Sequence, residues 1–147
     1  MNVKFLFLNE LFYSDYAECV QIEQKSTRPY AQVYTKINGV RFAIPLRSNI
    51  THKEHVLWTD KSKNCGLDFS KAVVIVDEKY INATQAPYIR QNEFDSLRGK
   101  EYIIKQNLIK HINNYKMAKK MLHIKRNELL CGFSTMQYFE EYIENIT

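Results

Sequence analysis

The chain has 147 residues, 45% of them hydrophobic, and a formal net charge of +5 at pH 7. A chain of this length buries about 70% of its unfolded surface, so we expect one domain over residues 1–147 whose core needs no disulfide or metal. Its apolar runs are far shorter than the roughly 20 residues of a membrane helix and no signal-like segment precedes them, so we expect a soluble, cytoplasmic protein with no membrane partner.

The first part of the chain predicts short strands around one short helix. Val3 to Leu8 is a candidate strand, and Asn9 can cap the helix that follows it. Period-two alternation between Ala31 and Ile44, interrupted by Asn38-Gly39, predicts a β-hairpin whose turn takes two positive φ angles. Pro45 has no N–H to donate, so we expect it to end the strand and send the chain out of the sheet.

The ten residues after Pro45, LRSNITHKEH, concentrate groups that can act on a phosphodiester. Cleavage of RNA by its own 2′-OH requires side chains that hold the phosphate in line, move protons and neutralise the charge that grows at phosphorus. Groups of these types are present in Arg28, Arg47, Ser48, His52 and Lys53. The residues alone leave alternatives, because Ser48 can be a turn residue and Arg47 and Lys53 can be solvent-exposed charges.

Two more strands and a helical half follow. Lys71 to Val76 predicts a strand buried on both faces, and Tyr80 to Thr84 predicts another. From about Glu93 the apolar residues recur at helical spacing, and we expect this stripe to face the core: Leu97, Ile104, Leu108, Ile112 and Tyr115. Ser134 and Gln137 predict a reciprocal capping box at the start of a last helix. Strands first and helices last indicate an α+β fold.

Positive charge is concentrated in one segment. Residues 98–126 hold nine Lys or Arg against one acid, whereas residues 127–147 hold four acids and no Lys or Arg. Such a segment is either a solvated helix face or a surface that binds a polyanion. The sequence has no glycine-rich phosphate loop, HExxH or GxSxG motif, and its three cysteines lack metal-site spacing. His52 and His55 lack an evident third ligand, so we expect neither a metal nor a cofactor.

The order of several motifs resembles the toxins of type III toxin–antitoxin systems, nearest to the TenpN-like branch of the ToxN/AbiQ/CptN family. These motifs are RPY at residues 28–30, the Asn-Gly hairpin, a strand ending in AIPLRS, HK at residues 52–53, and GLDFSKAVVI at residues 66–75. The resemblance covers roughly residues 1–120. It implies a strongly twisted antiparallel sheet of the Kid/MazF type flanked by helices, in a metal-independent endoribonuclease that leaves a 2′,3′-cyclic phosphate.

The resemblance also implies partners. The toxin would process, and be inhibited by, the pseudoknot repeats of its own antitoxin RNA, in an RNA-bridged hetero-oligomer. Cellular or phage RNA would be its substrate, with a role in phage defence by abortive infection. The alternative is a non-catalytic RNA-binding module that uses the basic helical surface.

Carried over residue by residue, the resemblance places the family's basic residue on Arg28 and its active-site serine on Ser48. The family's lysine after the serine has no counterpart at the same distance, and His52 and Lys53 remain alternatives for acid/base work. The other candidates for RNA contact are Tyr30, Arg47, Asn49, His55, Trp58, Lys61 and Lys63 near the loop, and Lys105, Lys110, Lys116, Lys119 and Lys120 in the basic segment. Tyr30 can instead be a core aromatic, and Trp58 with the lysines after it a plain surface turn.

Overall fold

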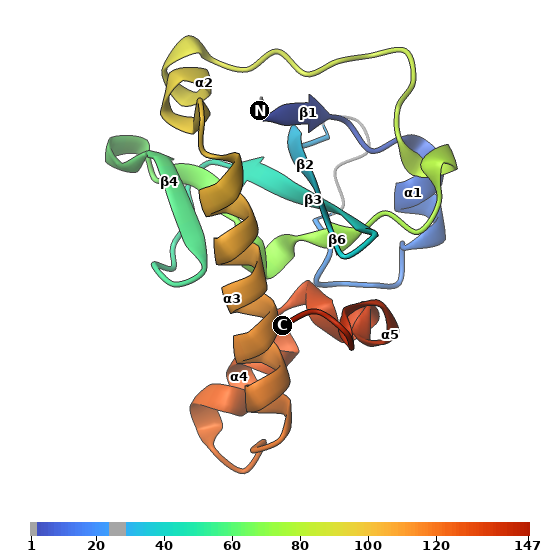
Figure 1. Ribbon diagram of the computed structural model, residues 1–147, viewed down its shortest axis with the longest axis vertical. Coiled ribbons are helices and arrows are strands. Elements are labelled where there is room, and N and C mark those ends of the chain that lie inside the picture. The colour runs from blue at the N-terminus through green and yellow to red at the C-terminus, as the bar shows by residue number, and fades with distance from the viewer. Residues whose placement is uncertain (1–2, 24–28) are drawn as a thin grey trace.

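The computed structural model describes residues 3–23 and 29–147 (Figure 1). Within these residues, six strands form an antiparallel sheet in the order β1-β2-β3-β5-β4, with β6 paired to β3. The strands are β1 Lys4–Leu6, β2 Gln32–Ile37, β3 Val40–Arg47, β4 Val56–Asp60, β5 Cys65–Asp68 and β6 Val73–Val74. Strand β1 is therefore shorter than the strand predicted from Val3 to Leu8.

Helices follow and flank the sheet, which confirms the predicted α+β class. The α-helices are α1 Glu10–Asp15, α2 Gln91–Leu97, α3 Glu101–Lys119, α4 Lys125–Phe133 and α5 Glu140–Ile143. Short 3₁₀ helices lie between them, at η1 Lys61–Lys63, η2 Phe69–Lys71, η3 Glu78–Tyr80 and η4 Thr135–Tyr138. Within the described part of the chain, no helix is long and apolar enough to cross a membrane.

The hairpin and the first helix form as the sequence predicts. Asn38 and Gly39 take φ angles of 49° and 80°, and β2 and β3 pair on either side of them. The side-chain oxygen of Asn9 accepts the backbone N–H of Phe12 at 3.0 Å, which caps α1. Both features depend on residues close together in sequence.

Pro45 does not end the strand, contrary to the prediction. It lies opposite Gln32 at the end of the β2 pairing, and β3 continues to Arg47. The N–H of Leu46 donates to the carbonyl of Ala31 at 2.8 Å, and Leu46 and Arg47 then pair with β5. The missing N–H of proline therefore falls where β3 exchanges one neighbour for another, and Arg47 stays in the sheet.

The region after the hairpin differs most from the prediction. The sequence does not predict the β4–β5 hairpin, in which a Cβ on Gly66 would lie 2.6 Å from the carbonyl oxygen of Leu57. The strand expected from Lys71 to Val76 is reduced to the two residues of β6. The strand expected from Tyr80 to Thr84 is wrong, because the chain leaves a 3₁₀ turn there and makes one isolated bridge, between Ile81 and Leu8.

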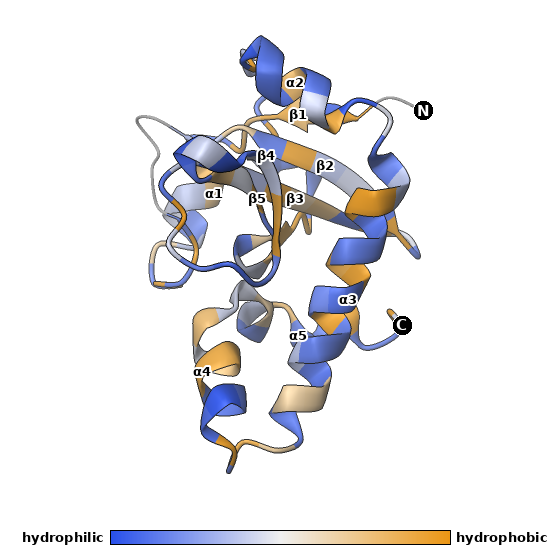
Figure 2. Ribbon diagram, turned by 90° about the vertical axis from the view of Figure 1, so that its left-hand side faces the viewer, coloured by the Kyte–Doolittle hydropathy of each residue, from blue (hydrophilic) through white to orange (hydrophobic). Residues whose placement is uncertain are grey.

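The helical half packs through the predicted stripe. Its five residues on α2 and α3, namely Leu97, Ile104, Leu108, Ile112 and Tyr115, are all buried. From the sheet, α3 extends downward beside α4, so that the two helices project away from the strands (Figures 1 and 2). The predicted capping box is wrong in detail, since Ser134 accepts from the N–H of Met136 and Gln137 donates to backbone carbonyls.

Candidate functional site

The loop that joins β3 to β4, residues 48–55, is anchored near both ends. Ile50 is buried, and its N–H donates to the carbonyl of Asn64 at 3.0 Å. At the other end, the carbonyl of His55 accepts the N–H of Phe69 at 2.8 Å. Ser48 and Asn49 lie before this anchor and Lys53 lies between the two contacts, and all three are exposed. The loop therefore offers polar side chains to solvent from a fixed backbone.

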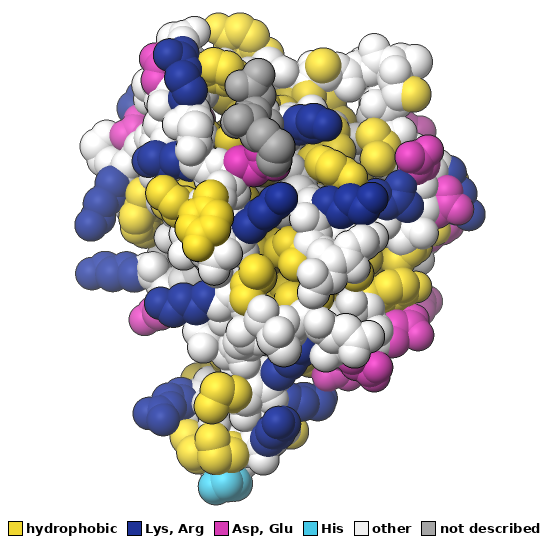
Figure 3. Space-filling view, in the orientation of Figure 1, with side chains coloured by type: hydrophobic (Ala, Val, Ile, Leu, Met, Phe, Trp, Pro, Cys, Tyr) yellow, Lys and Arg dark blue, Asp and Glu magenta, His cyan; other side chains and the backbone are white. Residues whose placement is uncertain are grey.

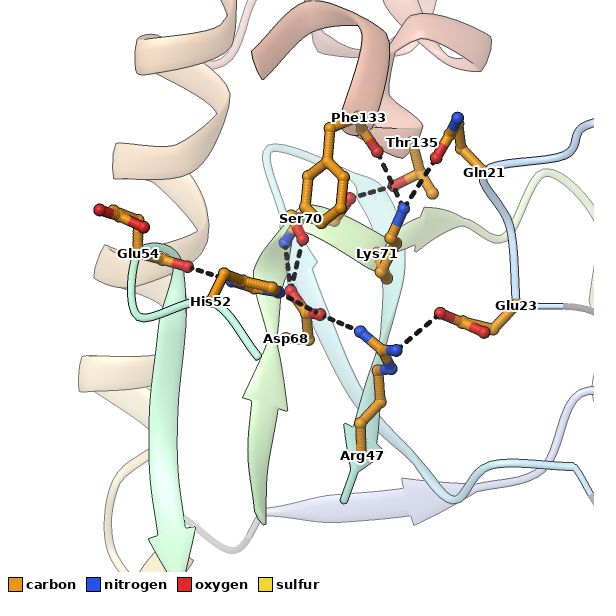
Figure 4. Close-up of polar contacts among 10 residues, drawn as sticks. All are labelled: Gln21, Glu23, Arg47, His52, Glu54, Asp68, Ser70, Lys71, Phe133 and Thr135. Atoms are coloured by element: carbon orange, nitrogen blue, oxygen red, sulfur yellow. Dashed lines mark hydrogen bonds and ion pairs between the residues drawn. The ribbon is translucent and has the colours of Figure 1, made fainter. Parts of the chain in front are cut away.

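Beneath the loop, Asp68 is the centre of a buried polar cluster (Figure 4). Asp68 is 0% exposed. Its Oδ2 accepts from Nη1 of Arg47 at 2.5 Å and from Nε2 of His52 at 3.0 Å. Its Oδ1 accepts from the backbone N–H of Ser70 at 3.1 Å and from the Ser70 hydroxyl at 2.5 Å. Each carboxylate oxygen thus has two donors, as a buried charge requires.

This cluster fixes the charge of His52. Nδ1 of His52 lies 2.9 Å from the carbonyl oxygen of Glu54, and Nε2 faces Asp68. A carbonyl and a carboxylate both accept hydrogen bonds, so both ring nitrogens must donate and the ring is an imidazolium. The hydrogen bond to Asp68 is the main cause that raises the pKa of His52. Burial alone would raise the pKa of Asp68, but the hydrogen bonds from His52 and Ser70 outweigh it and lower that pKa.

Arg47 belongs to the same cluster. Its second terminal nitrogen, Nη2, lies 2.9 Å from Oε1 of Glu23, and 18% of its side chain is exposed. Burial opposes its charge, but the hydrogen bond to Asp68 and the charges of Glu23 and Asp68 raise its pKa. The Arg47 guanidinium is therefore held between two carboxylates.

The cluster also joins the sheet to the C-terminal helices. Nζ of Lys71 donates to Oε1 of Gln21 and to the carbonyl of Phe133, each at 3.0 Å, and lies 4.0 Å from the centre of the Phe133 ring (Figure 4). Thr135 donates to the carbonyl of Ser70 at 3.1 Å. Residues far apart in sequence thus fix the position of η2, which follows Asp68.

A pocket of about 190 Å³ opens beside Ser48. Its walls come from three parts of the chain that meet there: Tyr30, Ala31, Leu46, Arg47, Ser48, Tyr88, Arg90 and Glu93. Of the predicted site residues, Tyr30, Arg47 and Ser48 are therefore brought together. The sequence did not single out Tyr88, Arg90 or Glu93, and no local pattern marks them, because packing of α2 against β4 brings them to the pocket.

A second depression, a groove of about 760 Å³, lies between α3, α4 and the loop. His52, Glu54 and His55 form its end nearest the sheet, and its apolar walls include Met117, Met121, Leu129 and Phe133. His52 lines this groove, whereas Ser48 lines the smaller pocket. The structure places Ser48 and His52, two of the four predicted catalytic residues, at different depressions, with both nitrogens of His52 engaged by Asp68 and Glu54.

His55 contacts His111, a buried histidine of α3. Its ring lies 4.6 Å from that of His111, whose Nε2 is 2.9 Å from the Ser134 hydroxyl. Burial lowers the pKa of His111 to about 3, and burial is also the main cause that lowers the pKa of His55. Burial therefore favours the neutral form of both rings.

The predicted lysines differ in how far they are engaged. On α3, Lys105 pairs with Glu101 at 3.8 Å and Lys119 pairs with Glu140 at 3.7 Å. Lys116 donates to the carbonyls of Glu144 and Ile146 near the C-terminus. By contrast, Lys110 and Lys120 are exposed and make no ion pair with the described residues. Figure 3 shows basic side chains spread over one face of the molecule, down to the end of the helical projection.

The remaining predicted residues lie around the β4–β5 turn or outside the described residues. Trp58 is half-buried in β4, and Lys61 and Lys63 are exposed on η1. This turn lies next to α2, where Nδ2 of Asn92 donates to Oδ2 of Asp60 at 3.2 Å. Arg28 lies outside the described residues. Across residues 3–23 and 29–147, no three His, Cys, Asp or Glu side chains are grouped to hold a metal ion.

Comparison with known proteins finds a match among the solved structures. The sequence matches no family model and no curated protein. A solved structure matches with a TM-score of 0.62 and 17% sequence identity, covering 99% of this chain and 100% of that chain. It is described as "New insights into the mechanism of bacterial Type III toxin-antitoxin systems: selective toxin inhibition by a non-coding RNA pseudoknot". The resemblance to type III toxins is thus confirmed at the level of the fold, which this chain shares with that protein over almost its whole length.

Proposed function

We propose that this chain is the toxin of a type III toxin–antitoxin system and that it cleaves RNA without a metal. The observation that carries the proposal is the combination of the shared fold with the pocket at the end of β3. There an exposed Ser48, the residue on which the resemblance places the family's active-site serine, lies beside Tyr30 and two arginines. Hydroxyl, cationic and aromatic groups in one pocket suit a single-stranded nucleotide.

The proposed reaction is attack by a 2′-oxygen on the adjacent phosphorus. The 2′-OH loses its proton, the new 2′-O–P bond forms, the P–O5′ bond breaks, and the 5′-oxygen takes up a proton. The products are a 2′,3′-cyclic phosphate and a 5′-OH, with no water consumed. We assign Ser48 to hydrogen bonding at the reacting phosphate and Arg28 to charge neutralisation there.

For the acid/base position, the geometry favours Lys53 over His52. Both nitrogens of His52 donate to fixed acceptors, so that ring can exchange a proton with RNA only after it leaves Asp68. Lys53 is exposed on the same loop. An ammonium group can donate a proton to the departing 5′-oxygen. We therefore propose that His52 holds the loop in shape through Asp68 and that Lys53 takes the place of the family's lysine.

The proposed inhibitor is a pseudoknot RNA made of the repeats that the toxin itself cuts, in an RNA-bridged hetero-oligomer. The proposed substrates are cellular or phage RNA, which would give the system a role in abortive infection. Exposed lysines support this proposal, because phosphate contacts outside the active site bind RNA without regard to sequence. Lys61, Lys63, Lys110 and Lys120 are exposed and suit these contacts.

Cleavage of a mixed-sequence RNA by purified protein in excess chelator tests the proposal. We expect fragments ending in a 2′,3′-cyclic phosphate, with S48A and K53A losing at least about 100-fold in rate. Thr51→Ala serves as the matched control, because Thr51 is an exposed hydroxyl of the same loop. A requirement for a metal, or full activity in S48A, would contradict the mechanism. Binding without any cleavage would favour the non-catalytic RNA-binding module.

A further inference from the structure

The pocket beside Ser48 has a second wall whose residues are not explained by the reaction above. Tyr88 and Arg90 come from the segment before α2, and they face the pocket together with Tyr30 and Ser48. Arg90 is the residue before the first turn of α2, and Glu93 lies within that turn.

Arg90 is held by a buried carboxylate. Its Nε and Nη2 both donate to Oε1 of Glu93, at 2.9 and 2.6 Å, and Nη2 also lies 3.3 Å from the Cys65 sulfur. The other oxygen of Glu93 accepts from the Thr59 hydroxyl at 2.5 Å. Glu93 is 4% exposed, yet 49% of the Arg90 side chain is exposed. Nη1 of Arg90 has no hydrogen bond within the described part of the chain, so this edge of the guanidinium is available to a ligand.

Burying the Glu93 carboxylate is costly because it loses its contact with water, and the hydrogen bonds from Arg90 and Thr59 offset part of that cost. A neighbouring pair at the C-terminal end of α2, Arg98 with Asp95 at 2.8 Å, makes a similar contact with both partners exposed. The Glu93 pair differs because one partner is fixed inside and the other is turned outward. A guanidinium held in this way keeps one orientation and presents Nη1 to a phosphate.

Tyr88 complements this cation. Its side chain lies two residues before Arg90 and is 89% exposed, so it contributes little to the core. Isolated exposed aromatics are common and need no explanation. This ring, however, lines the pocket that also contains Tyr30, Ser48 and Arg90. An exposed ring beside a phosphate-binding cation matches the way proteins hold single-stranded RNA, by stacking a base next to a backbone contact.

We infer that Arg90 and Tyr88 form a nucleotide subsite next to the reacting phosphate, in which Nη1 of Arg90 binds a backbone phosphate and the Tyr88 ring stacks on a base. Glu93 is the positioning residue of this subsite, since it orients Arg90 without reaching the RNA. The inference rests on the proposed function for the position of the reacting phosphate. Its ligand is single-stranded RNA, read by charge and stacking.

Binding of short single-stranded oligonucleotides with 2′-fluoro sugars tests the subsite apart from cleavage, because they lack the attacking hydroxyl. We expect R90Q to weaken binding about 10- to 100-fold and Y88A about 5- to 100-fold, while Y88F binds like the parent. R90K should recover part of the loss, because it keeps the charge without the fork. Arg98→Gln and Tyr102→Ala are the matched controls, as an exposed arginine directly after α2 and an exposed tyrosine of α3.

The salt dependence of RNA binding distinguishes a positioning role of Glu93 from a purely structural role, because a structural role would leave that dependence unchanged. We expect E93Q to weaken binding and to lower the dependence of log K on log salt, as R90Q should by about 0.7 for one lost phosphate contact. E93Q should add little in a chain that already carries R90Q. A lower melting temperature with an unchanged salt slope would assign Glu93 to the fold and overturn its positioning role.

The outcomes for the subsite and for the proposed function are separable. If the parent protein cuts RNA and both R90Q and Y88A bind and cut like the controls, the subsite is wrong and the ribonuclease stands. If the parent binds RNA but never cuts it, while both variants lose binding, the subsite stands and the ribonuclease is wrong.

Discussion

Two buried carboxylates hold arginines at the Ser48 pocket, and they hold them in different ways. Asp68 belongs to a closed cluster in which Arg47 is bound on both terminal nitrogens, by Asp68 and Glu23. Glu93 binds Arg90 on one side and leaves the other side half-exposed. The first arrangement serves the fold and the second presents a cation. Exposure separates the two roles, and so does the identity of the engaged nitrogens, since both terminal nitrogens of Arg47 are bound whereas Nη1 of Arg90 is not.

The largest effect should come from opening the Asp68 cluster. Asp68→Ala leaves Arg47 and His52 without their shared partner, and breaking a buried ion pair costs about 3–5 kcal/mol. We expect that loss in the free energy of unfolding, measured with urea. Asp95→Ala is the control, because its pair with Arg98 is exposed and should be worth at most about 1 kcal/mol. Equal losses in the two variants would remove the basis for treating the cluster as structural.

The next largest effect is on the pH dependence of the free energy of unfolding, which should differ between the Asp68 cluster and the Glu93 site. Because the folded pKa of His52 is raised, its stabilising contribution is complete below the unfolded value of 6.5 and is lost as pH rises through the folded pKa. The lowered pKa of Asp68 acts in the opposite direction, and its contribution is lost as pH falls through the folded value below 3.8. We therefore expect H52Q to cost more stability at pH 6 than at pH 9, by urea unfolding.

At the Glu93 site we expect no such change. The Arg90 guanidinium stays charged throughout this range, so R90Q should cost the same stability at pH 6 and pH 9. An effect of H52Q that is equal at both pH values, or that grows toward pH 9, would show that His52 is not the charged partner of Asp68.

The smallest effect extends the comparison to the lysines of α3. Lys110 and Lys120 are exposed without an ion pair among the described residues, whereas Lys105 and Lys119 face Glu101 and Glu140. We expect K110Q/K120Q to lower the salt slope of RNA binding by up to about 1.4, at about 0.7 for each phosphate contact to a single strand. K105Q/K119Q should lower it less. The reverse order would place the RNA on another surface.

The parts of the fold that the sequence predicted depend on local chemistry. Asn38-Gly39 needs no distant partner to form its turn, Asn9 caps α1 by accepting the N–H of Phe12 three residues later, and the α3 stripe repeats at the helical period. The prediction that Pro45 ends the strand is wrong because the effect of a proline depends on which strand lies beside it. The missing N–H falls where β3 passes from β2 to β5, and only the pairing of distant segments reveals that.

In the candidate site, too, the sequence predicts what depends on local residues and misses what depends on distant ones. Ser48 and Tyr30 were found because they lie in the hairpin region that carries the resemblance. One contact of the Asp68 cluster is indicated by the sequence, because an Asp two residues before a Ser is typical of a turn in which the Asp side chain accepts the backbone N–H two residues later. The sequence carries no such signal for Tyr88 and Arg90. An exposed tyrosine and arginine between two helices can be recognised as site residues only from the pocket that they line, and the packing of α2 against β4 forms that pocket.

The central claim is that Ser48 and Arg90 act on one RNA strand in one pocket. The rates of single-turnover RNA cleavage by the parent, S48A, R90Q and the double variant test it directly. Residues that act as a unit give effects that do not multiply. We predict that S48A/R90Q is hardly slower than the slower single variant. A double variant whose loss equals the product of the two single losses would show that Ser48 and Arg90 act independently, and would contradict the account.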